Sequence, residues 1–513
     1  MQHRQIINVI NFIRGCEPRS ETDLVTPVRE QIDLMQKHGL RGTFLLQYDA
    51  LIRPDFQALL RPLDPEQFEL GVWYEYNQPL VEKAGLVWRG RFPWDWHSDC
   101  AMSVGYTEAE REACIDVLFR DFQLIFGYLP RSLGGWAFDA HSIAYAHDRY
   151  GLTAACNCKE QWGTDGYNLW GGYYGQAYYP AKTNAFAPAQ QKANQIDVPV
   201  FRMLGSDPVL QYDFGLDLQE GIGCQKVITL EPAYESAGGG NPDWVDWYLC
   251  ENFNGKCLSF GYAQAGQENS FGWPSMKDGL TSQFEKIAAL QAAGKLVCER
   301  LCDSGAWYRQ TYAETPASAI VADDDWSRSG KRSAWYCCRN YRANLYAENG
   351  SIWLRDLYLF RDAYHERYLG SVCGGSVLTY DNLPVVDGAR FSGDGIRAGL
   401  YPFVDGEPLT FEGFDWSEQD GAAVVTLTGT QAGTVTVTFT ETGISVLSDR
   451  EIRLVQAFCA SARAKWMDSA SSQDGVFTGT VRGCTYQVRL TAGQTGRQYR
   501  MDARLDEPAS LQA

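Results

Sequence analysis

The chain changes its pattern of hydrophobic and polar positions about two thirds of the way along. In the first region, short apolar runs alternate with segments in which apolar residues recur every three or four positions. Short apolar runs are typical of buried parallel strands, and the three-to-four spacing is typical of amphipathic helices. The runs that predict strands are residues 6–12, 43–46, 68–73, 133–139, 152–156, 198–204, 227–230, 256–262 and 296–301.

Helix signals lie between these runs. The segment from Leu24 to Met35 has helical spacing and is followed by Gly39, a typical end signal. Thr107 and Glu110 form a capping box before a helix that should end at Gly127. Further helices are predicted at residues 142–150 and 282–293. Repeated strand–helix units predict a parallel sheet, either as a barrel or as an open doubly wound sheet.

After Thr315 the pattern changes to alternating apolar and polar positions. Residues 424–427 and 434–439 alternate in this way, with turn residues between them, and similar alternation recurs at 452–458 and 486–490. This period is typical of antiparallel strands with one buried face, most simply in a β-sandwich. The sequence therefore predicts an α/β domain over residues 1–315 and a C-terminal β-domain over residues 316–513.

Composition narrows the classes of partner and compartment. The 513-residue chain has a net charge of −18, so the phosphates of nucleic acids and anionic membranes would be repelled. The apolar run near the start is too short and too polar for a signal peptide or a membrane span. The 15 cysteines show no paired Cys-x-x-Cys spacing, which favours reduced thiols over a structural zinc site. We expect a cytoplasmic protein, and the sequence leaves a homo-oligomer open.

Aromatic and polar residues are interleaved after several predicted strands. The densest segment, residues 162–189, has no hydrophobic period and is predicted to be an ordered functional loop. Rings can stack on the C–H faces of sugars while amides and carboxylates bind hydroxyls; alternatively, the rings merely cover the mouth of the domain. The candidate substrate-binding residues are Arg14, Trp73, Asp95, His97, Trp136, Asp165, Trp170, Tyr173, Arg202 and Gln267.

Two short motifs and the order of elements resemble the glycoside hydrolase/deacetylase superfamily over roughly the first 310 residues. Residues 11–15, Asn-Phe-Ile-Arg-Gly, are similar to the Thr-Phe-Asp-Asp-Gly motif of polysaccharide deacetylases. Residues 69–77 are similar to their Glu-Ile-Gly-x-His-x-x-x-His motif. The resemblance, which extends to glycoside hydrolases of families 57 and 38, implies an irregular seven-stranded (β/α) barrel, here followed by the antiparallel β-sandwich.

The metal ligands of that superfamily are replaced in this chain. Ile13 and Arg14 stand at the two acidic positions, and Trp73 and Asn77 stand at the two histidine positions. These side chains cannot together hold a divalent ion, so we expect no metal and no cofactor at the usual site.

A second set of residues leaves zinc open. Asp95 with His97, and Asp139 with His141, would each point to one face of an extended segment. Together they could hold zinc, as in a deacetylase or mannosidase-like enzyme. The simpler interpretation is that His97 binds a sugar hydroxyl and His141 begins a helix.

Carboxylates at strand ends are the candidate catalytic groups. Hydrolysis of a glycosidic bond needs one protonated and one ionised carboxyl group. Glu75 follows the third predicted strand, Asp139 follows the next, and Glu268 follows the strand that reaches Tyr262. We predict that Glu75 pairs with Asp139 or Glu268, with Arg14 holding one of them ionised. Each could instead cap a helix or form a salt bridge, and a non-catalytic carbohydrate-binding protein is the alternative function.

Overall fold

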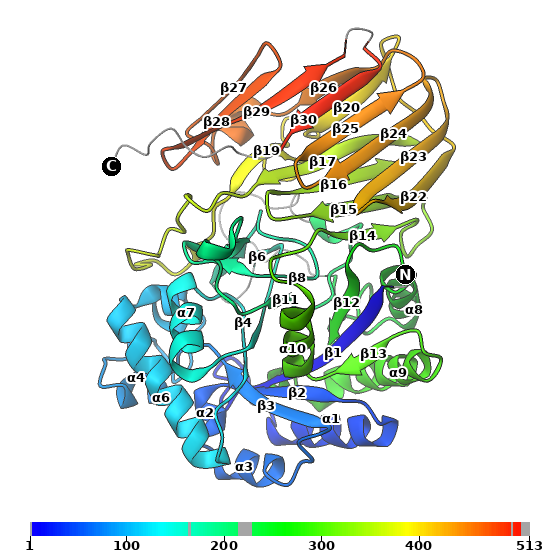
Figure 1. Cartoon of the computed structure of the whole chain (residues 1–513). Coiled ribbons are helices and arrows are strands. Elements are labelled where there is room, and N and C mark those ends of the chain that lie inside the picture. The colour runs from blue at the N-terminus through cyan, green and yellow to red at the C-terminus, as the bar shows by residue number, and fades with distance from the viewer. Residues whose placement is uncertain (1–2, 163–165, 214–227, 494–495, 504–513) are drawn as a thin grey trace.

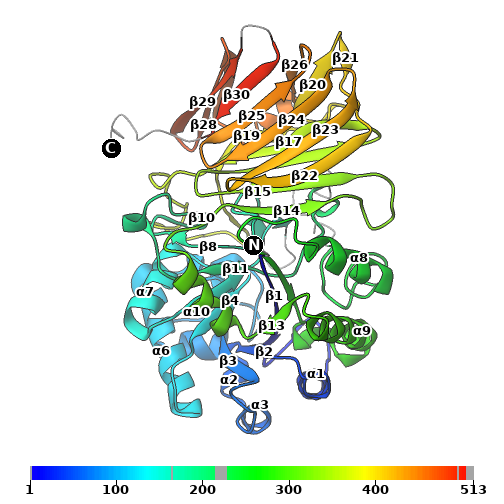
Figure 2. The same cartoon turned by 45° about the vertical axis from the view of Figure 1, so that its right-hand side comes forward.

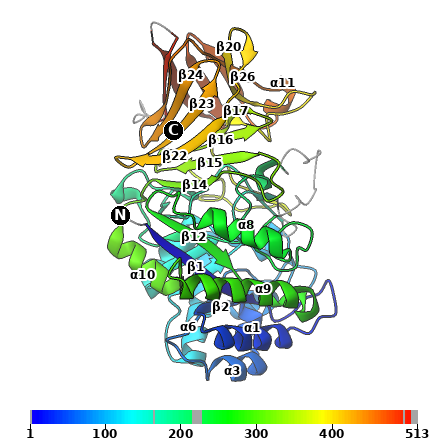
Figure 3. The ribbon, with the colours of Figure 1, turned by 90° about the vertical axis from the view of Figure 1, so that its right-hand side faces the viewer.

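The computed structural model describes residues 3–162, 166–213, 228–493 and 496–503. A region with a parallel sheet and surrounding helices forms one part of the molecule, and antiparallel sheets form the other (Figure 1). Views turned by 45° and 90° show the antiparallel sheets stacked on one end of the α/β region (Figures 2 and 3). The predicted α/β class followed by antiparallel β-structure is therefore present.

The parallel sheet contains the predicted buried strands. Within the described residues, seven strands lie side by side and parallel in the order β12–β1–β2–β3–β4–β5–β11. Two further strands join it: β13 (Val297–Glu299) pairs with β1, and β8 (Ala177–Tyr178) pairs antiparallel with β11. The bounds are β1 (Arg4–Ile13), β2 (Gly42–Leu46), β3 (Phe68–Trp73), β4 (Ser132–Gly135), β5 (Ala154–Asn157), β11 (Val200–Arg202) and β12 (Phe260–Ala265).

Side chains connect the two end strands of this path. The ring of Phe201 on β11 lies 5.1 Å from that of Tyr262 on β12, and the backbone N–H of Leu204 donates to the side chain of Gln264. No backbone ladder joins β11 to β12 in the described part of the chain. The arrangement is compatible with the predicted irregular barrel.

Helices begin and end where local signals place them in most cases. Helix α6 begins with the predicted Thr107–Glu110 capping box and ends at Gly127, which has φ 86°. Gly39, with φ 63°, ends α1. The helices are α1 (Val25–His38), α2 (Tyr48–Leu51), α3 (Pro54–Leu60), α4 (Gln78–Lys83), α5 (Ser98–Ala101), α6 (Glu108–Phe126), α7 (Ala140–Tyr150), α8 (Pro242–Asn252), α9 (Trp273–Ala292), α10 (Leu301–Thr311) and α11 (Ala460–Arg463), with short 3-10 turns η1 (Ser103–Gly105), η2 (Lys192–Asn194) and η4 (Asn269–Phe271).

Three expectations about local structure were wrong. Helix α9 starts nine residues before the predicted position 282, because Pro274 lies in its first turn and Gly279 packs against Pro232 instead of breaking the helix. Residues 228–230, the described part of a predicted strand, form no strand. The segment 162–189 also contains strands: β6 (Gln161–Trp162), β7 (Tyr167–Leu169), β8, β9 (Pro180–Ala181) and β10 (Asn184–Pro188).

The C-terminal region consists of two antiparallel sheets that share an apolar core, which is compatible with a β-sandwich. One sheet contains β14 (Ser318–Ala322), β15 (Arg332–Cys337), β16 (Tyr341–Glu348), β17 (Ser351–Leu359), β19 (Leu383–Asp387), β20 (Gly399–Val404), β21 (Glu407–Pro408) and β26 (Arg453–Ala457). The other contains β22 (Gly413–Gln419), β23 (Ala422–Thr430), β24 (Gly433–Thr440), β25 (Gly443–Ser448), β27 (Ser469–Gln473), β28 (Val476–Val481), β29 (Cys484–Ala492) and β30 (Gln498–Asp502).

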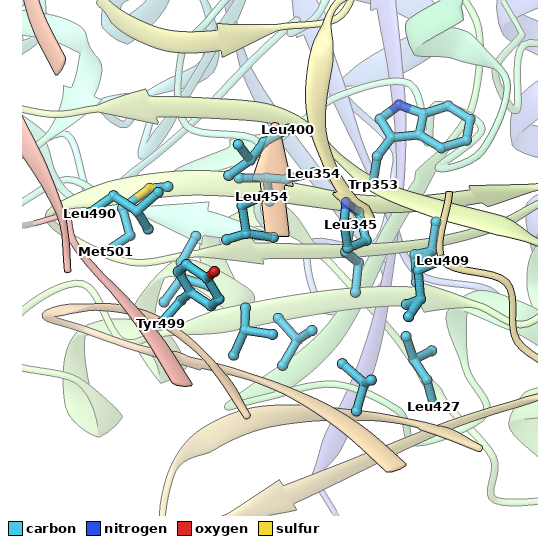
Figure 4. A pocket seen from close by; sticks show the side chains of 16 residues that line it. Leu345, Trp353, Leu354, Leu400, Leu409, Leu427, Leu454, Leu490, Tyr499 and Met501 are labelled. Atoms are coloured by element: carbon cyan, nitrogen blue, oxygen red, sulfur yellow. The ribbon is translucent and has the colours of Figure 1, made fainter. Parts of the chain in front are cut away.

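An apolar cavity of about 60 Å³ lies between these two sheets. Leu345 and Leu354 line it from one sheet, and Leu427 lines it from the other (Figure 4). Its lining is almost entirely apolar, so the cavity is an imperfection of the core rather than a polar binding site.

Residues 361–382 return from the β-region to the α/β region. Strand β18 (Leu378–Thr379) pairs in parallel with β7, and the hydroxyl of Tyr380 donates to the carbonyl of Phe138. The carboxylate of Glu366 accepts hydrogen bonds from the backbone of Ala140 and Ala185. The two regions are therefore joined by main-chain contacts as well as by side chains.

The described cysteines are all free thiols, most of them buried. Among the described residues, no helix has the length and apolar character needed to cross a membrane.

Candidate functional site

Arg14 lies at the centre of a buried charged cluster, directly after β1. Its side chain is fully buried, and three carboxylates surround its guanidinium group. Nη1 is 3.7 Å from Oε2 of Glu17, and Nη2 is 3.5 Å from Oε2 of Glu75 and 3.6 Å from Oε2 of Glu268. Parallel strands bring their carboxyl ends to one edge of a sheet, which is why residues after β1, β3 and β12 meet here.

Each of the two carboxylates beside Nη2 has a second donor. The indole Nε1 of Trp73 donates to Oε2 of Glu75 at 2.9 Å. The hydroxyl of Ser270 donates to Oε1 of Glu268. These contacts fix how both carboxylates face Arg14, because a carboxylate held by two donors has little freedom to rotate.

Backbone hydrogen bonds hold the end of β1 in position. Asn269 accepts from the N–H of Arg14 at 2.9 Å and donates to its carbonyl at 3.0 Å, which ties β1 to the segment after β12. The N–H of Gly15 donates to Oδ1 of Asp49 at 3.0 Å. A Cβ at position 15 would lie 2.5 Å from the backbone of Asp49, so only glycine permits this approach.

Asp49 adds another buried carboxyl group to this edge of the sheet, just after β2. Burial raises its pKa, against the opposing effects of the Gly15 and Ala50 N–H groups, the Cys16 thiol and the charge of Arg14. Its Oδ2 is buried and has no hydrogen-bond partner among the described residues. Asp49 can therefore carry a proton close to the charged cluster.

Aromatic rings form one wall of the cluster. The ring of Trp73 is stacked on that of Phe12, with centroids 3.9 Å apart, and Trp136 meets both edge-on at 5.4 Å. The guanidinium carbon of Arg14 lies 3.7 Å from the ring centre of Trp94. The predicted site residues Arg14, Trp73, Trp136, Glu75 and Glu268 are thus brought together.

Asp139 serves a different part of the fold. Its Oδ1 caps α7 by accepting from the N–H of Ser142 at 2.8 Å, and Arg111 lies 3.1 Å from the same oxygen. The hydroxyls of Ser103 and Ser142 donate to Oδ2. Burial raises its pKa, but the charge of Arg111 and these donors outweigh burial and hold the pKa of Asp139 below its usual range.

Asp95 and His97 lie on the loop before α5. Asp95 is buried and accepts from Arg91, with Oδ2 2.8 Å from Nε, and His97 Nδ1 lies 3.2 Å from its Oδ1. Burial raises the pKa of Asp95, but hydrogen bonds from Arg91 and the neighbouring His97 outweigh burial and lower it. His141, the other histidine considered for zinc, lies 3.1 Å from Glu112 instead.

Trp170 and Tyr173 face the β-region. Trp170 Nε1 donates to Asp387 at 3.1 Å, and the Tyr173 hydroxyl is 2.9 Å from that of Ser318. The structure does not place these two rings against Trp73 and Trp136.

Arg202 and Gln267 contact residues other than the carboxylates around Arg14. Arg202 binds the carbonyl of Ser206 at 2.8 Å and stacks on Tyr174. Gln267 precedes Glu268 and its Nε2 lies 3.4 Å from Glu231. Asp165 is outside the described residues.

A search of solved structures finds likenesses to the fold. A Parabacteroides distasonis protein, provisionally assigned as a glycoside hydrolase/deacetylase, superposes with a TM-score of 0.56 at 14% identity, over 74% of this chain and 90% of that one. The chain has a glycoside hydrolase/deacetylase-like fold. At 14% identity the likeness establishes the fold and leaves the activity to the site itself.

Two other solved structures are more distant from this glycoside hydrolase/deacetylase-like fold. A Mycobacterium smegmatis protein provisionally assigned as a polysaccharide deacetylase has a TM-score of 0.36 at 12% identity, over 60% of this chain and 92% of its own. A family 57 branching enzyme from Thermococcus kodakaraensis has a TM-score of 0.32 at 10% identity, over 61% and 72%. No protein-family model and no curated protein sequence matches the chain.

The superfamily's metal positions hold groups of another chemistry in this glycoside hydrolase/deacetylase-like fold. Ile13 is in the apolar core, and Asn77 caps α4 by accepting from the N–H of Leu80. Trp73 and Arg14 offer only N–H donors toward Glu75. Across the described part of the chain, no group of three or more His, Cys, Asp and Glu side chains could hold a metal ion. These residues do not fit the superfamily's metal.

Sequence reasoning missed Glu17, Asp49 and the position of Trp94 over Arg14. A usable signal existed for the first two, because each acidic residue follows a predicted strand within five residues. Trp94 had no such signal, since its place depends on a loop that folds back onto β1.

Proposed function

We propose that this protein is a glycoside hydrolase in which Glu75 and Glu268 form the acid/base pair. The observation that carries the proposal is that both carboxylates border the same nitrogen of Arg14, at 3.5 and 3.6 Å. The Oε2 atoms of Glu75 and Glu268 are therefore at most about 7 Å apart, an upper limit that allows the separations used by paired carboxylates of glycoside hydrolases.

The two carboxyl groups have environments that suit opposite protonation states. A tryptophan N–H can only donate, so Oε2 of Glu75 is fixed as an acceptor and the ionised form is favoured. The Ser270 hydroxyl beside Glu268 can donate or accept, so it tolerates a proton on that carboxyl group. Two carboxylates this close also disfavour simultaneous ionisation.

These environments suggest the roles of the pair. Glu268 donates its proton to the leaving oxygen of the glycosidic bond. Glu75 acts from the other side of the sugar ring, as nucleophile or as the base that activates water. Arg14 keeps Glu75 ionised and positions both groups.

The same geometry favours Glu268 over Asp139 as the partner of Glu75. Asp139 is occupied by its helix cap, two serine hydroxyls and Arg111. In this proposal residues 1–315 form the catalytic barrel, residues 316–513 supply the β-sandwich, and the substrate is a carbohydrate.

The test compares aryl and alkyl glycosides in single variants. Glu75→Gln should lower turnover about 10²- to 10⁴-fold on both. Glu268→Gln should lower turnover of alkyl glycosides to the same extent. Its turnover of dinitrophenyl glycosides should stay close to that of wild type, because their leaving group needs no proton. The control is Glu69→Gln, which removes an equally buried carboxylate on β3 that binds Thr43 and the N–H of Cys302.

The results can contradict the proposal in two ways. Near-wild-type turnover in both Glu75→Gln and Glu268→Gln would refute their assignment as the acid/base pair. A wild-type protein that binds oligosaccharides but cleaves none would show a carbohydrate-binding protein instead.

A further inference from the structure

A continuous series of rings and guanidinium groups runs from the surface to Arg14. We call it the aromatic–arginine ladder; its members are, from outside to inside, Phe92, Arg91, Trp96, Arg19, Trp94 and Arg14. Its outer end is exposed to solvent, and its inner end is Arg14, the centre of the buried charged cluster. No part of the catalytic proposal uses the outer members.

The spacings show that the ladder is continuous. Arg14 lies 3.7 Å from the ring centre of Trp94, and Arg19 lies 4.7 Å from that ring and 5.3 Å from that of Trp96. Arg91 is 4.9 Å from the Trp96 ring. Phe92 stacks with Trp96 at 5.9 Å, with ring planes 14° apart.

Exposure changes sharply along the ladder. Trp94 is fully buried, Trp96 is half-buried, and Phe92 is 40% exposed. A phenylalanine this exposed contributes little to the core, and its ring stacks on that of Trp96. It lies at the end of a series of contacts that leads inward to Glu75 and Glu268.

The loop that carries the ladder is held in place. The N–H of Gln78 donates to the carbonyl of Pro93 at 2.8 Å, and the N–H of Ser98 donates to the carbonyl of Ser376 at 3.1 Å. The Trp88 indole donates to the carbonyl of Phe92 at 2.8 Å. The rings are therefore preorganised, which lowers the entropic cost of binding a ligand.

Charges along the ladder are paired. Arg19 binds Glu17 at 2.7 Å, and Arg91 binds Asp95 at 2.8 Å. Because the charges are paired, this surface has no strong positive or negative potential. It therefore suits an uncharged ligand with apolar faces and hydroxyl edges. His97, whose ring lies 5.9 Å from that of Trp96, is a partly exposed hydrogen-bonding group beside the rings.

We propose that Phe92 and Trp96 form a subsite for an uncharged oligosaccharide, binding sugar units that lie away from the scissile bond. The inference rests on the proposed glycoside hydrolase function of Glu75 and Glu268. Sugar units contact the exposed part of Phe92 and the half-buried Trp96, and the chain extends along the ladder toward the carboxylate pair.

Binding is measured by calorimetry in the Glu75→Gln background, so that little substrate is consumed during the titration. The probes are hexasaccharides and disaccharides of glucose, mannose, galactose, xylose and N-acetylglucosamine in α- and β-linked series. Phe92→Ala should raise the Kd of the best hexasaccharide about fivefold to tenfold and leave that of its disaccharide unchanged. Trp96→Ala should have at least the same effect, and Trp96→Phe should restore part of it.

The matched control is Tyr128→Ala, which removes a 46% exposed aromatic ring after α6 and should change neither Kd. Equal hexasaccharide binding in Phe92→Ala, Trp96→Ala and the parent would overturn the subsite, as would a protein that binds none of the probes. Equal weakening of hexasaccharide and disaccharide would place the rings at the scissile bond and overturn the distal assignment. Binding that depends on Phe92 in a wild-type protein that cleaves nothing would support the subsite and refute only the hydrolase.

Discussion

The indole Nε1 of Trp73 donates a 2.9 Å hydrogen bond to Oε2 of Glu75, the same oxygen that lies 3.5 Å from Arg14. In the motif comparison, Trp73 stands at the position of a metal-binding histidine of polysaccharide deacetylases. In this chain, two N–H donors therefore converge on one carboxylate, and a guanidinium group supplies the positive charge. The site has the chemistry of a charged hydrogen-bond cluster.

Replacing Trp73 by phenylalanine should slow turnover while leaving substrate affinity nearly unchanged. The loss of one hydrogen bond to a carboxylate should cost about tenfold in kcat. Because a lost donor destabilises the ionised form, the acidic limb of the kcat/KM profile should move to higher pH. Trp136→Phe is the control, since its Nε1 has no hydrogen-bond partner among the described residues. Equal behaviour of both variants would contradict a positioning role.

Activity should survive removal of divalent metals. Arg14 already places a positive charge among Glu17, Glu75 and Glu268, and a second cation beside it would be repelled. Turnover after exhaustive EDTA treatment should match that of untreated protein, with elemental analysis run on both. Stoichiometric zinc that leaves together with activity would contradict this.

Should zinc be found, the ligands to test would be those of the second predicted set. Alanine variants of Asp95, His97, Asp139 and His141 would then be assayed for zinc content and for activity. Loss of both in the same variants would identify the ligands.

Protonation of Glu366 should make stability depend on pH. This carboxyl group joins residues 361–382 to the N–H groups of Ala140 and Ala185, at 3.0 and 2.8 Å. Burial and the nearby charge of Asp139 raise its pKa from 4.5 to about 8, against the effects of the two N–H groups and Arg111. Between these values the folded protein keeps a proton that the unfolded chain releases, so this group's contribution falls as pH rises.

The measurement is urea unfolding of wild type and Glu366→Gln at pH 5 and pH 8. The wild type should lose about 1 to 3 kcal/mol more stability than the variant over this interval. Glu285→Gln, on the exposed side of α9, serves as the control. An identical pH dependence in wild type and Glu366→Gln would refute the assignment.

The sequence predicted correctly those helices and strands whose bounds are set by residues within or next to them. Strand β3 has the predicted bounds because all six of its residues are buried, and α6 begins and ends at its own cap residues. Helix α9 was predicted too short because Gly279 interrupts its apolar pattern, although that glycine packs closely against Pro232. The start of α9 therefore depends on a contact between segments that are distant in the sequence.

The same distinction applies to the site. Strand order was enough to place Glu75 and Glu268 near Arg14, because parallel strands share one edge. Strand order could not show that Asp139 would form an ion pair with Arg111. Nor could it show that Trp170 would turn toward Asp387, which lies 217 positions further along the chain. Such partners leave no local pattern.

Filling the cavity of the β-region should stabilise it. Val437 on β24 lines the cavity, whose volume of about 60 Å³ has room for one more methylene group. Val437→Ile adds that group and keeps a β-branched side chain, so it should raise the free energy of unfolding by about 0.5 to 1 kcal/mol. Val437→Ala enlarges the same cavity and should lower the free energy of unfolding by about 2 kcal/mol. Differential scanning calorimetry of the three proteins gives the order of their Tm values, and a Tm below wild type for Val437→Ile would show that the cavity walls cannot accept the added group.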